Sequence, residues 1–251
     1  MTYNEKNAHR RDCRIRFEPE SHTYSAVDAD GVADVICDSV TTVVEGLFAQ
    51  FDADYWAARK ATAECSAEEL KAMWARRGEE ARNKGTELHD RIERYYLGEA
   101  PDAEALADRA FRNFLAFAAE VRLTPYRSEW RIFSERARLA GTLDFLAFDG
   151  DKYEIYDWKR SSKLVDAAGR VVDTDRYGRH AFAPVEHVPD TTFHHYALQV
   201  SLYRYILETE YGIEVAAGHL GTFHPDYDRP YVIDLPYMRR EAEIIVNSRC
   251  P

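Results

Sequence analysis

The hydrophobic period of the chain changes near residue 125, and this change constrains the fold more than any other feature. Residues 53–121 have the composition and apolar spacing of helices. The stretches "YRSEWRIFSE", "RLAGTLDFLAFDG" and "KYEIYDWK" then alternate between apolar and polar residues, which is typical of strands. Because Asp149–Gly150 is a hairpin turn signal, we predict helices followed by an antiparallel meander of three strands.

Elements on either side of the meander complete the predicted fold. A helix ("TTFHHYALQVSLYRYILETEYG"), two strands ("IEVAAGHLGTFH" and "YVIDL") and a closing helix ("MRREAEIIVNSR") follow it. This order, αβββαβ, predicts an α/β fold with a mixed central sheet flanked by helices on both faces. We expect residues 81–251 to form this core. Residues 1–80 are expected to be an extension made of a hairpin, with its turn at 28–31, and helices, the longest of which starts at a Ser66/Glu69 capping box.

Composition excludes several classes of protein. With 45% hydrophobic and 31% charged residues, the 251-residue chain is typical of a globular protein. It has no apolar run of the ~18 residues that a membrane helix needs and no signal-peptide core, so we expect an intracellular protein without a membrane partner. Four scattered cysteines form no CxxC pair, which disfavours a metal site or iron–sulfur cluster bound by cysteine.

Charge is distributed unevenly. The net charge of −11 argues against non-specific binding to nucleic acid. We nevertheless expect the connection at 160–192, together with the lysine before it, to form a locally basic loop. From residue 159 to 179, three acids stand against six basic residues: Lys159, Arg160, Lys163, Arg170, Arg176 and Arg179. The segment is therefore either a solvated loop or a contact for nucleic acid. The length of the connection, from Ser161 to Thr191, indicates that it is either functional or mobile.

Two acids are predicted to meet across the second hairpin. Counting outward from Asp149–Gly150, Asp144 and Asp157 lie opposite or nearly opposite each other, and Lys159 shares a strand face with Asp157. Like charges directly opposite each other are destabilising, so the pair needs compensation. A divalent cation such as Mg²⁺ or Mn²⁺ would supply it; the alternative is a surface pair compensated by Lys159 alone.

Two helical faces and one glycine add further candidates. Spacing of four places His89 and Glu93 on one helix face with Gly85, and Gln199 and Tyr203 on another with His195. Gly141 would allow a helix or a substrate backbone to approach the strand closely. Taken singly, each of these residues is more often structural than functional.

Together these fragments resemble one family. The order GxxxHxxxE, E, GxxD, DxK, QxxxY is similar to the RecB-type branch of the PD-(D/E)XK nuclease superfamily, which includes phage and mitochondrial exonucleases. The resemblance covers residues 85 to about 223. The matching residues are Gly85, His89, Glu93, Glu129, Gly141, Asp144, Asp157, Lys159, Gln199 and Tyr203.

The resemblance implies a metal-dependent phosphodiesterase mechanism. Asp144, Asp157 and the backbone carbonyl of Trp158 would hold the main metal, and His89 would complete its ligands. Lys159 would orient or deprotonate the attacking water and contact the scissile phosphate.

Other residues have supporting roles in this interpretation. Glu93 or Glu129 would position a second metal or order the ligands of the first, so one or two Mg²⁺ or Mn²⁺ ions are expected. Gln199 and Tyr203 would hold the DNA backbone or Lys159. DNA contacts are also expected from Arg160, Ser161 and Lys163.

The expected function is a Mg²⁺-dependent DNA nuclease, an exonuclease acting on DNA ends or single strands in recombination, repair or replication. A helicase, a recombinase or a single-strand-binding protein is an expected partner. Several relatives bind an iron–sulfur cluster through one upstream and three C-terminal cysteines, but this chain has Cys250 alone at its C-terminal end, so no cluster is expected. Aromatic residues in or beside the basic segment (Tyr177, Phe182 and Phe193) would stack bases, unless they simply pack the loop. The alternatives are a non-catalytic DNA-binding or scaffolding relative and a metal-free cluster of acids.

Overall fold

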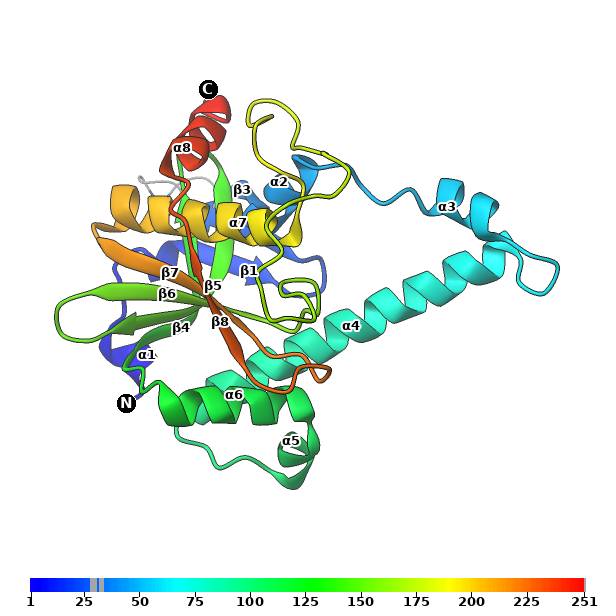
Figure 1. The fold of residues 1–251 in the computed structure, drawn as a ribbon. Coiled ribbons are helices and arrows are strands. Elements are labelled where there is room, and N and C mark those ends of the chain that lie inside the picture. Colours follow the sequence, from blue (N-terminus) through cyan, green and yellow to red (C-terminus); the bar gives the residue numbers. More distant parts are fainter. Residues whose placement is uncertain (28–30, 32–33, 251) are drawn as a thin grey trace.

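The strands form one mixed sheet (Figure 1). The computed structural model describes residues 1–27, 31 and 34–250, so most of the turn expected at 28–31 lies outside the described residues. The strands are β1 Ile15–Glu18, β2 Thr23–Val27, β3 Asp34–Ser39, β4 Pro125–Ser134, β5 Leu139–Phe148, β6 Tyr153–Lys159, β7 Val215–Thr222 and β8 Tyr231–Leu235.

Strand β5 is the centre of this sheet. The strand order is β1-β2-β3-β5-β6-β7-β8, and β4 pairs with the other edge of β5. The predicted meander is confirmed, because β4, β5 and β6 pair antiparallel in sequence order. Strand β3 pairs in parallel with the start of β5, through Ser39 and Ala140, whereas β6 pairs with its end. One edge of β5 is therefore shared by two strands that leave a fork between them.

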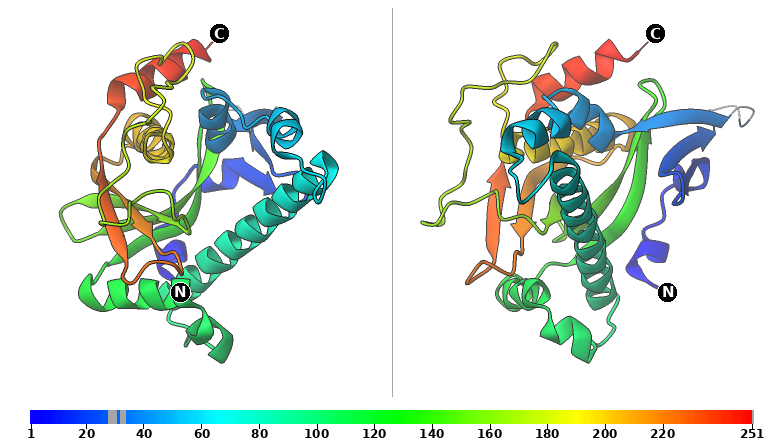
Figure 2. Two further views of the ribbon diagram at one scale, coloured as in Figure 1. Left: turned by 45° about the vertical axis from the view of Figure 1, so that its right-hand side comes forward. Right: turned by 90° about the vertical axis from the view of Figure 1, so that its right-hand side faces the viewer.

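Helices surround the sheet on both faces (Figures 1 and 2). They are α1 Tyr3–Lys6, α2 Val40–Gly46, α3 Ala53–Lys60, α4 Ala67–Tyr96, α5 Ala103–Ala107, α6 Arg109–Glu120, α7 Thr192–Ile206 and α8 Arg239–Ser248, with a 3₁₀ turn at Asp12–Arg14 and a π-helical turn at Leu207–Tyr211. Helix α4 begins at the predicted capping box. The Ser66 hydroxyl accepts the Glu69 amide and the Glu69 carboxylate accepts the Ser66 amide, at 3.3 and 2.7 Å. The expected division at residue 80 falls inside this helix.

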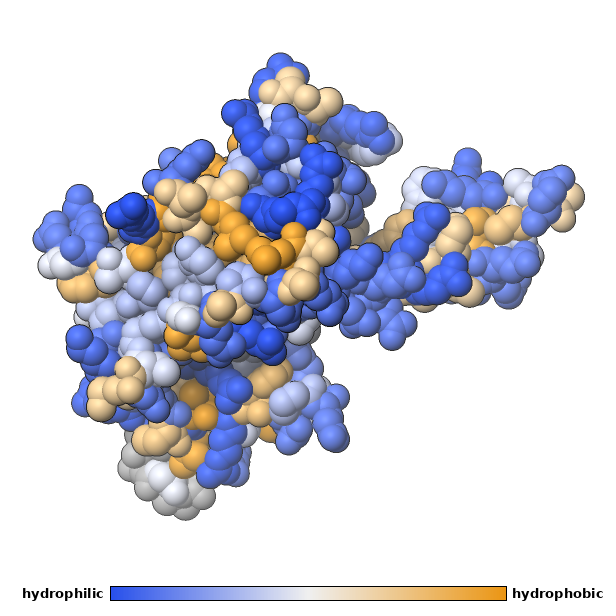
Figure 3. All heavy atoms as spheres, turned by 90° about the horizontal axis from the view of Figure 1, so that it is seen from below, coloured by the Kyte–Doolittle hydropathy of each residue, from blue (hydrophilic) through white to orange (hydrophobic). Residues whose placement is uncertain are grey.

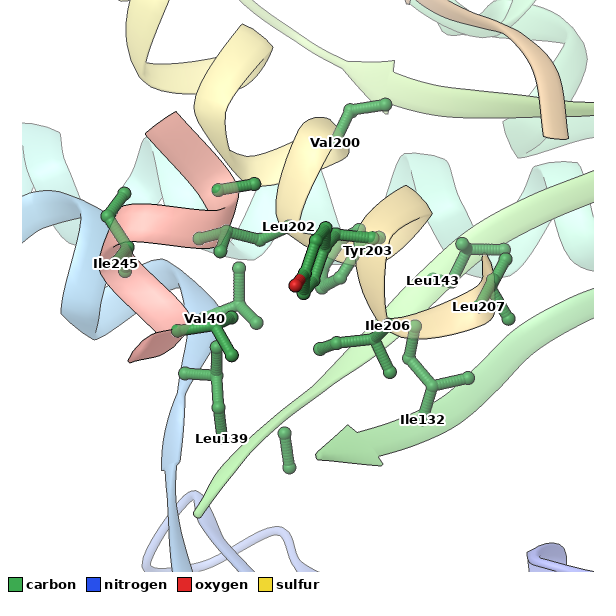
Figure 4. Close-up of a cluster of buried hydrophobic side chains, with 14 of the residues drawn as sticks. Val40, Ile132, Leu139, Leu143, Val200, Leu202, Tyr203, Ile206, Leu207 and Ile245 are labelled. Carbon is green, nitrogen blue, oxygen red and sulfur yellow. The ribbon is translucent and has the colours of Figure 1, made fainter. Parts of the chain in front are cut away.

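Side chains alternate between the two faces of the central strands. Ile155 joins a core cluster with α7, α8 and α2, where Val40, Leu202 and Ile245 meet (Figure 4). On the other face, Trp158 packs with α6 and with the C-terminal part of α4. This alternation explains how β6 can be buried on both sides. The α/β architecture of a central mixed sheet between helices is thus as predicted.

The connection between β6 and α7 is ordered by its own contacts. It contains two isolated bridges, Val165 with Val171 and His180 with Pro189. Two of its cations form ion pairs with acids of the same segment: Arg170 with Asp166 at 2.9 Å and Arg179 with Asp175 at 3.1 Å. Over residues 160–192 five acids balance five Lys and Arg residues, so the expectation of a basic loop is wrong for the segment as a whole and holds only for its part up to residue 179.

The aromatic residues of this region differ in exposure. Tyr177 and Phe182 are exposed, but Phe193 is buried in a small cluster with Leu164 and Leu220. Packing rather than base stacking thus explains Phe193. None of the helices in the described part of the chain combines the length and the apolar character needed to cross a bilayer.

Candidate active site

The candidate site lies where β5 and β6 separate. Their register, with Phe145 opposite Tyr156, is the predicted one. Beyond this pair β6 continues along β7 as far as Lys159. Asp144 and Asp157 are the next residues on the two separating strands, so both carboxylates stand at the opening of the fork.

Three groups occupy this opening. Asp144 Oδ2 accepts a hydrogen bond from the Trp158 amide at 2.8 Å. The Lys159 ammonium lies 2.5 Å from Asp157 Oδ2 and 4.0 Å from Asp144 Oδ2. Asp157 is 1% exposed and Asp144 8%. Two carboxylates and one ammonium group are therefore held together with little access to water, which strengthens their interactions.

Helix α4 and strand β4 bring two more ligand-type side chains to the fork. His89 Nε2 lies 2.7 Å from the Trp158 carbonyl oxygen. His89 Nδ1 lies 3.7 Å from Glu129 Oε1 and 3.7 Å from Asp144 Oδ1. Ligand atoms of His89, Glu129 and Asp144 all lie within 4.8 Å of one another. Oxygen-rich sets of this kind suit Mg²⁺ and Mn²⁺.

Glu129 reaches this position through an unusual backbone conformation. Its φ is +44°, a region that non-glycine residues rarely adopt. The neighbouring pairs, Ser128 with Phe145 and Trp130 with Leu143, place Glu129 opposite Asp144. Such strain persists only where the surrounding structure imposes it, and it is concentrated at functional sites.

Two expected ligands make other contacts. Asp157, expected to hold the main metal, faces Lys159 and accepts a hydrogen bond from Gln199 Nε2 at 3.1 Å. Glu93 accepts a hydrogen bond from the Ser128 hydroxyl at 2.9 Å. The Tyr3 hydroxyl donates to the same Ser128 oxygen at 2.9 Å, so the N-terminal segment reaches the edge of the site.

A line of contacts from α7 positions Asp157. Gln199 Nε2 lies 3.4 Å from the Tyr203 hydroxyl as well as close to Asp157. Tyr203 lies against Gly141: a Cβ at residue 141 would be 2.7 Å from Cε1 of the ring and 2.9 Å from its hydroxyl. The close approach predicted for Gly141 is thus made by helix α7.

Burial and mutual charge shift the protonation of the site. Burial raises the pKa of Asp157 to about 6, although Lys159 opposes the shift. Burial alone would lower the pKa of Lys159, but Asp157 and Asp144 raise it above its ordinary value. Burial also disfavours the charged form of His89, yet Asp144 and Glu129 raise its pKa to about 9. At neutral pH the metal-free site therefore holds a protonated lysine and a protonated histidine among its acids.

A hollow of about 310 Å³ adjoins the fork. Four residues expected to contact DNA or hold its backbone line it: Arg160, Ser161, Lys163 and Gln199. Tyr203, expected to act with them, is instead buried behind Gln199.

Tyr196 also lines the hollow and was missed by the sequence analysis. The Lys159 ammonium lies 4.9 Å from the centre of its ring. The available signal was helical spacing, because Tyr196 precedes Gln199 by three residues and shares its face.

Comparison with known protein families identifies a match that includes the residues of the candidate site. A model of the PD-(D/E)XK nuclease superfamily matches residues 42–226. No curated protein matches the chain. Among solved structures, the crystal structure of SSO0001 is 17% identical to this chain, with a TM-score of 0.24. That alignment covers 58% of this chain and 61% of the other, so this chain spans less than two thirds of the length of SSO0001.

Proposed function

The chain belongs to the PD-(D/E)XK nuclease superfamily, and we propose that it is a metal-dependent DNA nuclease. One observation carries the proposal: Asp144, Asp157 and Lys159 meet at the fork of β5 and β6. A buried acid pair beside a lysine suits metal-assisted phosphodiester hydrolysis, since the acids can hold a cation and the lysine can hold a phosphate oxygen.

The donor set fits a divalent cation. His89, Glu129 and Asp144 offer three ligand atoms close together, and the Trp158 carbonyl oxygen lies beside His89. A bound Mg²⁺ or Mn²⁺ supplies an activated water and stabilises charge that develops on the phosphate. We assign one ion to this set, with Asp157 adjoining it. Glu93, which Ser128 holds, would help to order a second ion.

The side chains of the protein then have distinct roles. Lys159, whose pKa is raised by its acidic neighbours, acts as a charged donor that holds the scissile phosphate and orients the water. Gln199 fixes the carboxylate of Asp157, and Tyr203 fixes Gln199. Tyr196 supports the Lys159 ammonium with its ring face.

Substrate class and biological setting form the finer part of the proposal. The hollow lined by Arg160, Ser161 and Lys163 would hold the backbone of a DNA end or single strand. The motif order of residues 85 to about 223, and not the hollow, supports the further proposal that the protein is an exonuclease of the RecB-type, cluster-free branch, as in phage and mitochondria. Its setting would be intracellular recombination, repair or replication, with a helicase, a recombinase or a single-strand-binding protein as partner.

The division of the chain is also proposed. Residues 81–251 would form the nuclease core and residues 1–80 its extension. Two contacts support a close association of the two parts: β3 pairs with β5, and the Tyr3 hydroxyl donates to Ser128.

End-labelled single- and double-stranded DNA, incubated with Mg²⁺, Mn²⁺ or EDTA, would test the nuclease. We expect wild-type cleavage with either metal and none with EDTA. Lys159→Ala should lose cleavage while still folding and binding DNA. The product ladder would report end preference and polarity. DNA binding without cleavage by the wild type under any metal would instead favour the non-catalytic DNA-binding relative.

A further inference from the structure

We propose that the outer part of α4, from Gly78 to His89, is a track along which a single nucleic-acid strand reaches the candidate site. This inference rests on the proposed function, because the track ends at the histidine of that site. Helix α4 runs as one element from the fork out to α3, and its buried residues, Leu88 and Ile92, lie in its C-terminal part. The rest of the helix forms an arm that stands clear of the body (Figures 1 and 3).

One face of this arm continues the face that presents His89. At about 100° per residue, Trp74, Gly78, Arg82 and Gly85 all lie within about 60° of His89 around the helix axis. The distance along the axis from Gly78 to His89 is about 16 Å. A strand that follows this face therefore arrives at the metal-ligand cluster without turning around the helix.

Two glycines on this face have no packing role that explains them. Apart from the chain neighbours and the backbone of the helix itself, a Cβ at Gly85 would meet no atom of the described residues within 4 Å, and one at Gly78 would meet only the end of the Arg82 side chain, at 3.5 Å. Glycine within a helix is destabilising relative to alanine. Open space above a helix glycine leaves room for the close approach of a nucleic-acid backbone, and Gly85 lies one helical turn from His89.

The acids of the arm lie off this strip. Between residues 71 and 89 the face within about 60° of His89 carries Lys71 and Arg82 and no Asp or Glu. Glu79 borders it at about 80°, Glu80 and Glu87 lie on the opposite side of the helix, and the other cations are divided between the remaining faces. Lys71 is engaged by Asp54 of α3 at 2.8 Å, whereas Arg82 is exposed. In a chain of net charge −11, an acid-free strip that leads to the site favours an anionic ligand.

Aromatic rings at the far end of the strip favour a single strand over a duplex. Phe51 and Trp74 pack edge to face with ring centres 5.4 Å apart, and Phe51 is 63% exposed. Unpaired bases can stack on such rings, whereas a duplex hides the faces of its bases. Along the helix the strip thus carries the ring of Trp74, then Gly78, Arg82 and Gly85, and it ends at His89 of the candidate site.

Two matched pairs of variants test the track. Arg82→Ala removes the cation on the strip, and Arg76→Ala removes an exposed arginine on the other side of the same helix. Gly85→Leu fills the open space, and Asn83→Leu places the same side chain outside the strip. Binding of a fluorescein-labelled single-stranded oligodeoxynucleotide is measured by anisotropy in EDTA, so that cleavage is not involved. Thermal unfolding checks the fold of each variant.

We expect Arg82→Ala to weaken binding several-fold and to lower the slope of log K against log salt by about 0.7. Gly85→Leu should weaken binding by about tenfold or more, with both controls within about twofold of wild type. Mn²⁺ binding by Gly85→Leu is measured in parallel. If this variant no longer binds Mn²⁺, the leucine has disturbed the candidate site, and the comparison of Arg82→Ala with Arg76→Ala then decides whether the track exists.

Three results would overturn the track. They are equal loss of affinity in Arg82→Ala and Arg76→Ala, wild-type affinity in Gly85→Leu, or a loss of affinity for a blunt duplex as large as the loss for the single strand. Failure of the track and failure of the proposed function are distinguishable. If only the track fails, the wild type still cleaves DNA and the variants bind the oligonucleotide as the wild type does. If only the proposed function fails, the variants differ in binding but the wild type does not cleave DNA with any metal.

Discussion

Gly141→Ala tests the line of contacts that positions Asp157. The added methyl group would lie 2.7 Å from Cε1 of the Tyr203 ring and 2.9 Å from its hydroxyl. Tyr203 is 3% exposed, so its ring has little room to move, and overpacking of this kind costs about 1–3 kcal/mol. Displacement of Tyr203 would release Gln199, which hydrogen-bonds Asp157. Because a misplacement of about 1 Å can cost about a hundredfold in rate, cleavage should fall by about 10- to 100-fold.

Gly218→Ala is the matched control for this variant. Its methyl group would lie 2.8 Å from Cγ1 of Val200, which is also on α7. Both variants therefore press one methyl group against the same helix, but only Gly141 contacts the residue that holds Gln199. We expect similar losses of unfolding free energy from the two variants and a loss of cleavage from Gly141→Ala alone.

Urea unfolding and metal-dependent cleavage per folded molecule are the two assays. For a chain of this size, each kcal/mol also corresponds to about 2–4 °C in Tm. Equal loss of cleavage in both variants would show that α7 packing in general, and not the Tyr203–Gln199–Asp157 line, supports the site. Full cleavage by Gly141→Ala with reduced stability would refute the positioning role outright.

Three further predictions concern the charges of the site. His89 must lose a proton to bind metal and its pKa is about 9, so metal affinity should rise up to about tenfold per pH unit below that value; calorimetry in two buffers should detect proton release that His89→Ala abolishes. In the folded protein the pKa of Asp157 is raised to about 6. The protonated carboxyl group therefore stabilises the fold at any pH below the pKa of Asp157 in the unfolded chain, and this stabilisation, about 3 kcal/mol, is lost as the pH rises through 6. The unfolding free energy of Asp157→Asn, relative to that of metal-free wild type, should thus increase as the pH rises from about 4 to about 6. Urea unfolding that shows the same difference between the two proteins at every pH would contradict this. Tyr196→Leu should reduce cleavage by up to about tenfold through loss of the ring beneath Lys159, while Tyr196→Phe stays near wild type; equal rates for Leu and Phe would argue against the ring contact.

Local patterns in the chain were enough to predict the parts of the site that depend on one hairpin or one helix. Alternation and the Asp149–Gly150 turn predicted the register that sets Asp144 beside Asp157. A hairpin turn determines the pairing of the residues near it, and both acids lie within a few residues of this turn. Helical spacing likewise placed Gln199 and Tyr203 on one face.

The meeting of elements that are distant in sequence was decided by tertiary structure. Glu129 joins His89 and Asp144 from the strand beside β5, and its backbone there has a φ of +44° that no periodicity encodes. Glu93 shares a helix face with His89 but is bound by Ser128, and Phe193 is buried although it lies beside a basic loop. Sequence by itself determined the order of helices and strands and the identity of the acid pair, because both follow from contacts between near neighbours. The choice of which carboxylates surround His89 required packing between α4, β4 and the fork, since it depends on long-range burial and charge that act only in the folded chain.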